Sequence, residues 1–75
     1  MTNQFVILIH DEFDDHAPQE YESFDTLKEA YRLYNGMRNL SRPSMYDDGC
    51  ELVLDIEADD GFTERIELDY FTFIK

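Results

Sequence analysis

Basic residues are scarce in this chain of 75 residues. Six lysines and arginines stand against 18 aspartates and glutamates, and the formal net charge is −12. A small domain needs a net charge of only about 2 to 8 in magnitude to stay soluble. Because phosphate contacts require Lys and Arg, the composition disfavours direct binding to DNA or RNA and to an anionic membrane surface. It favours a basic protein as partner.

Cysteine and long apolar runs are also scarce. The single cysteine, Cys50, cannot form an internal disulfide, which fits a reducing cytoplasm. No apolar run approaches the roughly 20 residues of a membrane-spanning helix. The opening residues, MTNQFVILIHDEF, lack the basic start of a signal peptide, and their apolar run is short. We therefore expect a cytoplasmic protein.

Apolar residues are present in sufficient number for one core. Hydrophobic residues make up 43% of the chain and aromatic residues 15%, which argues against disorder despite the charge. A chain of this length has room for one core, so we expect a single domain over residues 1–75.

The hydrophobic patterns predict the order β(β)αββ. Residues 4–10, QFVILIH, form a continuous apolar run, which indicates a strand buried on both faces. Residues 20–24 alternate and predict a short second strand. Residues 25–40 show helical spacing with Asp25 as the N-cap, and residues 41–49 are expected to form a loop. The apolar stripe expected on the helix consists of Leu27, Ala30, Tyr31, Tyr34 and Met37.

The last third of the chain predicts a hairpin of two half-buried strands, residues 50–58 and 62–74. A three-residue loop, Asp59-Asp60-Gly61, keeps apolar residues opposite apolar residues. Gly61 would supply the left-handed residue of a type I turn with a bulge. The expected pairs are Leu54 with Ile66, Asp55 with Arg65, Val53 with Glu67, Leu52 with Leu68, Glu51 with Asp69, and Cys50 with Tyr70.

Together these elements predict an α+β fold, in which one helix packs on one face of a small, mostly antiparallel sheet of three or four strands. The closing segment YFTFIK has apolar residues on both faces. Phe71 and Phe73 are therefore either covered by a loop or exposed for a partner.

Neither metal nor cofactor chemistry is expected. The segment HDEFDDH, residues 10–16, places two histidines near four carboxylates, but their spacing matches no standard zinc site. A calcium loop starting at Asp55 fails, because Asp60 stands at the required glycine and Ile66 at the closing glutamate.

Catalysis is not expected either. The chain contains no glycine-rich phosphate loop and no Ser-His-Asp signature. Asp48 and Glu51 flank Cys50 closely, and acidic neighbours oppose its activation as a nucleophile.

The carboxylates of the predicted hairpin are the candidate functional groups. Residues on one face of a strand recur about every 6.6 Å, twice the rise per residue, which is comparable to the separation of successive phosphates along a nucleic acid backbone. A rigid carboxylate array could therefore occupy a Lys/Arg groove that normally holds nucleic acid. The predicted partner-binding residues are Glu51, Asp55, Glu57, Asp59, Asp60, Glu67 and Asp69, a second patch of Asp14, Asp15, Asp47 and Asp48, and Tyr46 as an aromatic anchor.

With its acid-rich strands over residues 51–69 and its loop DEFDDH, the sequence resembles small phage-encoded inhibitors of host defence. The leading examples are anti-CRISPR proteins and anti-restriction DNA mimics. The resemblance is to a type, over the whole chain, and rests on no shared motif. It implies a stoichiometric inhibitor in the host bacterial cytoplasm, whose acidic surface binds a basic nucleic-acid-binding site of a Cas effector and blocks target DNA.

Other interpretations share the same electrostatics. The chain could be an antidote that neutralises a basic toxin or nuclease, or a generic acidic interaction module whose charge serves solubility. The four bases within residues 28–42 could contact an acidic patch or pair with the chain's own acids. Both a monomer and a homodimer agree with the sequence.

Overall fold

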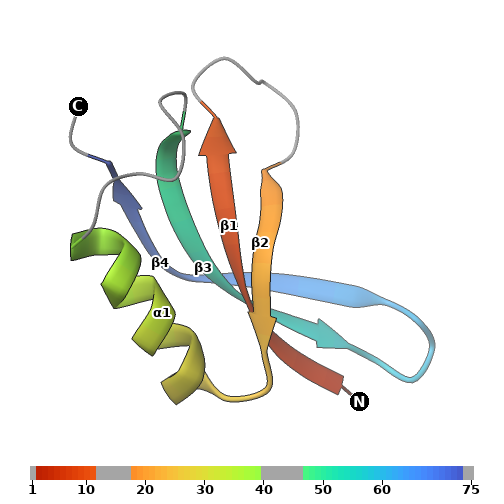
Figure 1. Ribbon diagram of the computed structural model, residues 1–75. Helices are drawn as coiled ribbons and strands as arrows, with labels where there is room; N and C mark the ends of the chain where they lie inside the picture. Colours follow the sequence, from red (N-terminus) through yellow and green to blue (C-terminus); the bar gives the residue numbers. More distant parts are fainter. Residues whose placement is uncertain (1, 12–17, 40–46, 74–75) are drawn as a thin grey trace.

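The structure, a computed structural model, describes residues 2–11, 18–39 and 47–73. These residues form four strands and one helix (Figure 1). The strands pair antiparallel in one sheet with the order β2-β1-β3-β4, so the predicted α+β fold is confirmed. The elements are β1 (Thr2–Asp11), β2 (Gln19–Phe24), α1 (Leu27–Asn39), β3 (Asp47–Glu57) and β4 (Thr63–Thr72).

β1 is a central strand that is buried on both faces, as its apolar run predicts. Ile7 and Ile9 belong to the core beneath α1, whereas Val6 and Leu8 belong to a second cluster on the other side of the sheet. We call the side without α1 the open face. β1 is longer than expected, since its pairing with β3 begins at Thr2.

α1 begins one residue later than the sequence suggested, and Thr26 caps it. The carbonyl oxygen of Thr26 accepts from the amide of Ala30 at 3.2 Å. Its Oγ1 accepts from the amide of Glu29 at 3.3 Å and donates to the Glu29 carboxylate at 3.0 Å. Thr26 is therefore the N-cap of α1, and the expectation that Asp25 is the N-cap was wrong.

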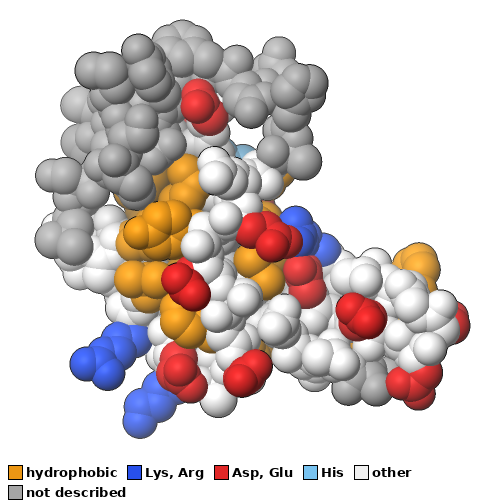
Figure 2. Space-filling view, turned by 45° about the vertical axis from the view of Figure 1, so that its right-hand side comes forward, with side chains coloured by type: hydrophobic (Ala, Val, Ile, Leu, Met, Phe, Trp, Pro, Cys, Tyr) orange, Lys and Arg blue, Asp and Glu red, His pale blue; other side chains and the backbone are white. Residues whose placement is uncertain are grey.

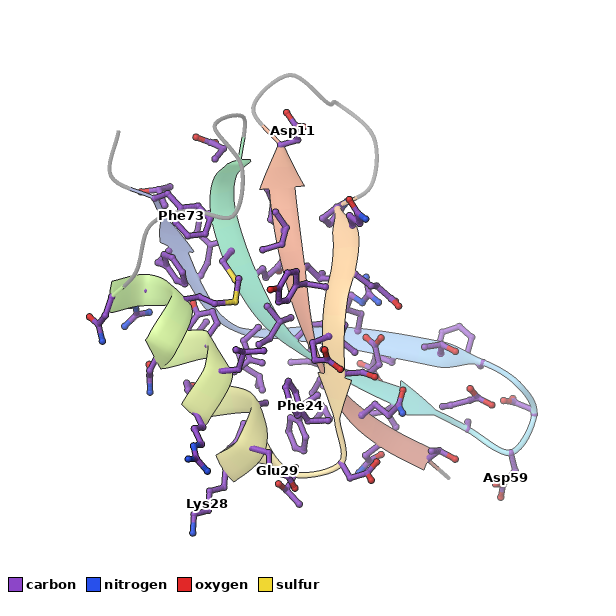
Figure 3. The ribbon with its side chains drawn as sticks, viewed as in Figure 1. Asp11, Phe24, Lys28, Glu29, Asp59 and Phe73 are labelled. Carbon is purple, nitrogen blue, oxygen red and sulfur yellow. The ribbon has the colours of Figure 1, made fainter. Side chains whose placement is uncertain are left out.

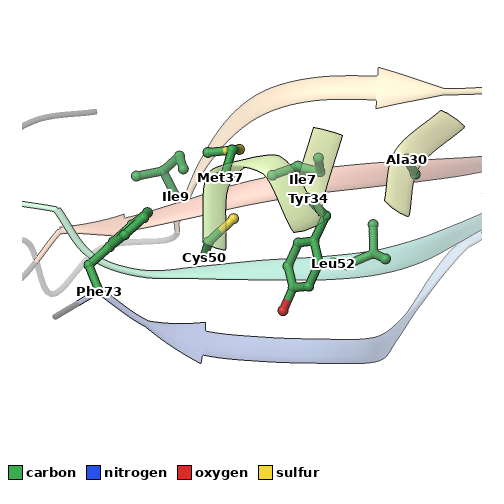
Figure 4. Close-up of a cluster of buried hydrophobic side chains, with 8 residues drawn as sticks. All are labelled: Ile7, Ile9, Ala30, Tyr34, Met37, Cys50, Leu52 and Phe73. Carbon is green, nitrogen blue, oxygen red and sulfur yellow. The ribbon is translucent and has the colours of Figure 1, made fainter. Parts of the chain in front are cut away.

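α1 covers one face of the sheet with a stripe of buried side chains (Figure 4). Ala30, Tyr34 and Met37 are buried as predicted, but Leu27 in the first turn remains 40% exposed. Leu33 packs against the core instead. The buried cluster consists of Ile7, Ile9, Ala30, Tyr34, Met37, Cys50, Leu52 and Phe73.

The turn between β3 and β4 has the predicted three-residue geometry. The amide of Gly61 donates to the carbonyl oxygen of Ala58 at 3.0 Å, and the amide of Ala58 donates to Phe62 at 2.8 Å. Gly61 has a φ of +87°, a left-handed conformation that glycine adopts without steric cost. The loop of residues 59–61 therefore sets the first half of the hairpin register.

The second half of the hairpin departs from the prediction at Leu68. The pairs nearest the turn are as expected, but β4 then shifts by one residue between the partners of Val53 and Leu52. Because of this β-bulge, every later side chain of β4 lies on the face opposite to the one predicted from regular alternation. Three predicted pairs are therefore wrong, because Leu52 pairs with Asp69, Glu51 with Tyr70, and Cys50 with Phe71.

The bulge also determines where the aromatic residues at the end of β4 are buried. Phe71 and Phe73 turn toward α1, where Phe73 is 7% exposed and Phe71 packs against the same cluster. Tyr70 turns to the open face and remains 41% exposed. The one-residue shift thus joins the end of β4 to the helix-side core.

Candidate functional site

The distal part of the β3–β4 hairpin projects away from α1 (Figure 1). We call residues 55–67 the hairpin arm. The arm contains six acidic residues and one basic residue, Arg65. Its tip carries Phe62, which is 67% exposed, and Ile66 on one of its strands is 39% exposed. The arm therefore carries exposed apolar side chains as well as acids.

The predicted acid Asp55 is held on the open face by Arg65. Asp55 accepts two hydrogen bonds from Arg65, Nε to Oδ1 and Nη2 to Oδ2, both at 2.7 Å. The same Nη2 donates to the Glu20 carboxylate of β2 at 3.2 Å. These hydrogen bonds, above all those to Asp55, raise the pKa of the Arg65 guanidinium above its ordinary value. We call this arrangement the Arg65 clasp.

The Arg65 clasp spans the open face from β3 to β2. In the sheet, β1 lies between β3 and β2, so a bridge from Asp55 to Glu20 passes over β1. The right-handed twist of a sheet brings two diagonal corners together on one face. Val6, Leu8 and Val53 on that face are only 0–2% exposed.

Glu51 is the second predicted acid with an internal partner. His10 Nε2 lies 2.9 Å from Glu51 Oε1, and the two side chains are 32% and 17% exposed. The ring of Tyr70 packs edge-on against His10 with centroids 5.4 Å apart. The pKa of Tyr70 is raised by burial and then by the neighbouring charges of Asp48 and Glu51. This cluster occupies the end of the open face opposite the arm.

Asp69 lies on the helix side of the sheet because of the bulge at Leu68. Its Oδ2 accepts from Arg38 Nη2 at 3.3 Å. The Arg38 guanidinium also lies 5.2 Å from the ring centroids of both Tyr34 and Phe71. Asp69 therefore contributes to the packing of α1 on the sheet and does not share a row with Glu51.

The seven predicted hairpin acids are thus divided into two groups. Glu51, Asp55 and Asp69 contact His10, Arg65 and Arg38, respectively. The others are exposed on the arm: Glu57, Asp59, Asp60 and Glu67. Within this second group, Asp60 Oδ1 accepts from the amide of Phe62 at 3.0 Å and so also shapes the turn.

The arm also contains one exposed acid, Glu64, that was not among the predicted binding residues. Glu64 pairs with Ile56, and alternation along β4 places its side chain on the face opposite to that of Arg65 and Glu67. The same pattern that identified Glu67 could have identified Glu64. Carboxylates consequently lie on both faces of the arm, as Figure 2 shows in part, and Figure 3 places Asp59 at its end.

The second predicted patch lies only partly within the described residues. The backbone of Asp47 belongs to β3, and Asp48, expected in a loop, is also part of that strand. Asp14, Asp15 and Tyr46 lie outside the described residues. In the part that the structure describes, no group of three or more His, Cys, Asp or Glu side chains could hold a metal ion; His16 is outside it.

A groove between α1 and β2 is a separate surface feature. It has a volume of about 470 Å³ and is lined by the apolar side chains of Phe24 and Leu33 and by Glu22, Glu29 and Arg32. Figure 3 shows Phe24 and Glu29 where the end of β2 meets the start of the helix. The groove lies at the β2 edge of the sheet, whereas the arm is formed by β3 and β4.

Within residues 2–11, 18–39 and 47–73, the helix α1 is not long and apolar enough to span a membrane.

Known proteins give no further guide to the function of these surfaces. Comparisons with protein families, with curated proteins and with solved structures found no match to this chain.

Proposed function

We propose that this protein is a non-enzymatic inhibitor that inserts its hairpin arm into a basic nucleic-acid-binding site of another protein. The arm supports this function because it projects away from α1 (Figure 1) and carries both exposed carboxylates and an exposed phenylalanine, Phe62. In line with the resemblance to anti-CRISPR proteins, the proposed partner is a Cas effector whose target DNA is blocked. An acidic antidote against a basic nuclease would use the same arm.

The distribution of charge on the arm favours a cleft as the partner surface. Glu57 and Glu67 belong to the open face, whereas Glu64 belongs to the other face. A flat surface could contact only one of these faces, but a channel that surrounds a nucleic acid strand could contact both. Phe62 at the tip would provide the buried aromatic contact that dominates many interfaces.

The internal ion pairs reduce the number of carboxylates that could imitate the phosphates of a nucleic acid. Asp55 and Glu51 already contact Arg65 and His10, so a phosphate-like row along all of β3 is interrupted. Five other acids of the arm are exposed: Glu57, Asp59, Asp60, Glu64 and Glu67. We therefore assign the attraction for the partner to these exposed acids, and the positioning of the arm to Asp55 and Arg65.

A competition assay with charge-reversed variants tests this proposal. Cas effector–guide RNA complexes would be incubated with a fluorescent target duplex and increasing amounts of the protein. Each exposed ion pair contributes up to about 1 kcal/mol, and reversal also adds repulsion. The variant Glu57→Lys/Glu67→Lys should therefore inhibit about tenfold to a hundredfold less well. Inhibition by the unaltered protein should weaken as salt is raised.

The matched control variant changes the net charge of the protein by the same amount, but at residues outside the hairpin arm. Asp25, Asn35 and Asn39 are exposed and lie outside the arm, so the variant Asp25→Lys/Asn35→Lys/Asn39→Lys, which changes the net charge by the same amount, should inhibit within about threefold of the unaltered protein. Equal losses in this variant and in the arm variant would mean that net charge alone matters. If no effector is inhibited, and a basic nuclease is, the antidote function replaces the anti-CRISPR function.

A further inference from the structure

The outer edge of β2 is available for pairing with another strand. β2 is the end strand of the sheet, and no strand among the described residues pairs with its outer side. Residues Gln19 to Ser23 are exposed, and Phe24 is partly buried. An unpaired edge presents backbone N–H and C=O groups that can bind an extended segment of another chain.

The side chains of β2 connect this edge to the groove on α1. Glu22 pairs with Ile7 and Phe24 pairs with Phe5, and both β1 partners belong to the helix side of the sheet. The side chains of Glu22 and Phe24 therefore point to the same side, where they line the groove together with Leu33. A strand added to β2 would have alternate side chains at this groove.

The charges of β2 select the kind of strand that can pair there. Its charged residues are Glu20 and Glu22, and it contains no base. Two copies of β2 side by side would bring four glutamates together, and like charges on neighbouring strands are destabilising. The groove is also acidic overall, because Glu22 and Glu29 outnumber Arg32. A basic segment is therefore favoured over a second copy of this chain.

We propose that β2 and the groove bind an extended segment of a partner protein in which a basic and an apolar residue stand two positions apart. The basic residue lies opposite Glu22, and the apolar residue lies opposite Phe24 and enters the groove beside Leu33. A bulge in β2 between the partners of Ile7 and Leu8 restricts regular pairing to Glu22–Phe24. The bound segment is therefore short. This site is separate from the hairpin arm and does not depend on its proposed function.

A short peptide of sequence TTKTVTKT, acetylated and amidated at its ends, is a suitable probe. Its lysines and its valine are two positions apart in either direction, so it satisfies the proposed pattern in parallel and antiparallel pairing. Titration into the ¹⁵N-labelled protein should shift the amide resonances of β2 and of α1 around Leu33. The peptide TTKTSTKT, which lacks the apolar side chain, should bind at least about threefold more weakly, because the apolar surface that the valine buries is lost.

Two variants with the same charge change distinguish a specific effect of the groove on peptide binding from an effect of the overall charge of the protein. Glu22→Lys should weaken peptide binding about fivefold or more, whereas Glu57→Lys on the arm should change it by less than about twofold. If Glu22→Lys does not give the spectrum of a folded protein, Glu22→Gln replaces it and should weaken binding about twofold. The proposal is overturned by equal losses in both Lys variants, by shifts confined to the arm, or by no shifts at millimolar peptide.

Discussion

The Arg65 clasp offers the sharpest test of how this sheet is held in shape. Asp55→Asn removes the charge from a carboxylate that accepts two hydrogen bonds of 2.7 Å from one guanidinium. The volume of the side chain stays nearly the same, but its amide nitrogen is a donor, so one of the two hydrogen bonds from Arg65 is lost together with the charge. The loss of stability should therefore report the charge and the hydrogen bonding of the pair, with little contribution from packing.

The expected size lies between those of a buried and an exposed ion pair. The side chain of Asp55 is only 17% exposed, but that of Arg65 is 41% exposed. Hydrogen bonds to charged groups contribute about 1.5–3 kcal/mol, whereas exposed pairs contribute about 0.2–1 kcal/mol. We expect Asp55→Asn to lower the free energy of unfolding by about 1–2 kcal/mol. In a domain of this size that corresponds to a loss of about 5–15 °C in Tm.

A double-mutant cycle would isolate the pair. Urea unfolding followed by circular dichroism would be measured for Asp55→Asn, Arg65→Gln and the double variant, and the coupling energy should be about 1 kcal/mol or more. Glu57→Gln, on the same face but exposed, is the matched control and should change stability by less than about 0.5 kcal/mol. A coupling energy near zero, or an equal effect of Glu57→Gln, would refute the clasp as a stabilising element.

Two further predictions concern a glycine and a buried tyrosine. A Cβ on Gly49 would collide with Tyr70 Oη and lie 2.8 Å from the carbonyl oxygen of Phe71, so Gly49→Ala should destabilise by about 1–3 kcal/mol in urea unfolding. At Gly36, a Cβ would meet nothing within 4 Å, so Gly36→Ala should stabilise the protein by about 0.5–1 kcal/mol. Equal changes in the free energy of unfolding for the two glycine variants would contradict this prediction. Burial raises the pKa of Tyr34 above its ordinary value of 10.0, so its phenol ionises first in the unfolded chain, and stability should fall as the pH rises above about 10. Tyr34→Phe should flatten this fall in urea titrations between about pH 9 and 11.5, and an unchanged fall would contradict the assignment.

Local patterns determined most of the secondary structure. The run of apolar β-branched residues in β1 could satisfy only a position buried on both faces. The spacing of Ala30, Tyr34 and Met37 identified the buried stripe of the helix. Gly61 determined the turn, because a left-handed residue was needed there to keep apolar pairs in register. These features depend on neighbours within a few residues, which the sequence contains.

The bulge at Leu68 could not be read from the sequence. The segment IELDY alternates regularly, so local pattern alone extends the hairpin without interruption. The shift becomes favourable only when α1 is present, because it brings Phe71 and Phe73 into the helix-side core and Asp69 to Arg38. Burial of aromatic surface outweighs the regularity of one ladder position.

The division of the carboxylates into internal and exposed groups was likewise decided by tertiary structure. The sequence alone established a large excess of acids and placed many of them on the last two strands. Which of them remain exposed depends on partners far away in the chain: His10 meets Glu51 across 41 positions, and Arg65 meets Glu20 across 45. Such contacts follow from the order and the twist of the strands, since only the folded sheet brings β2 and β4 within reach of each other.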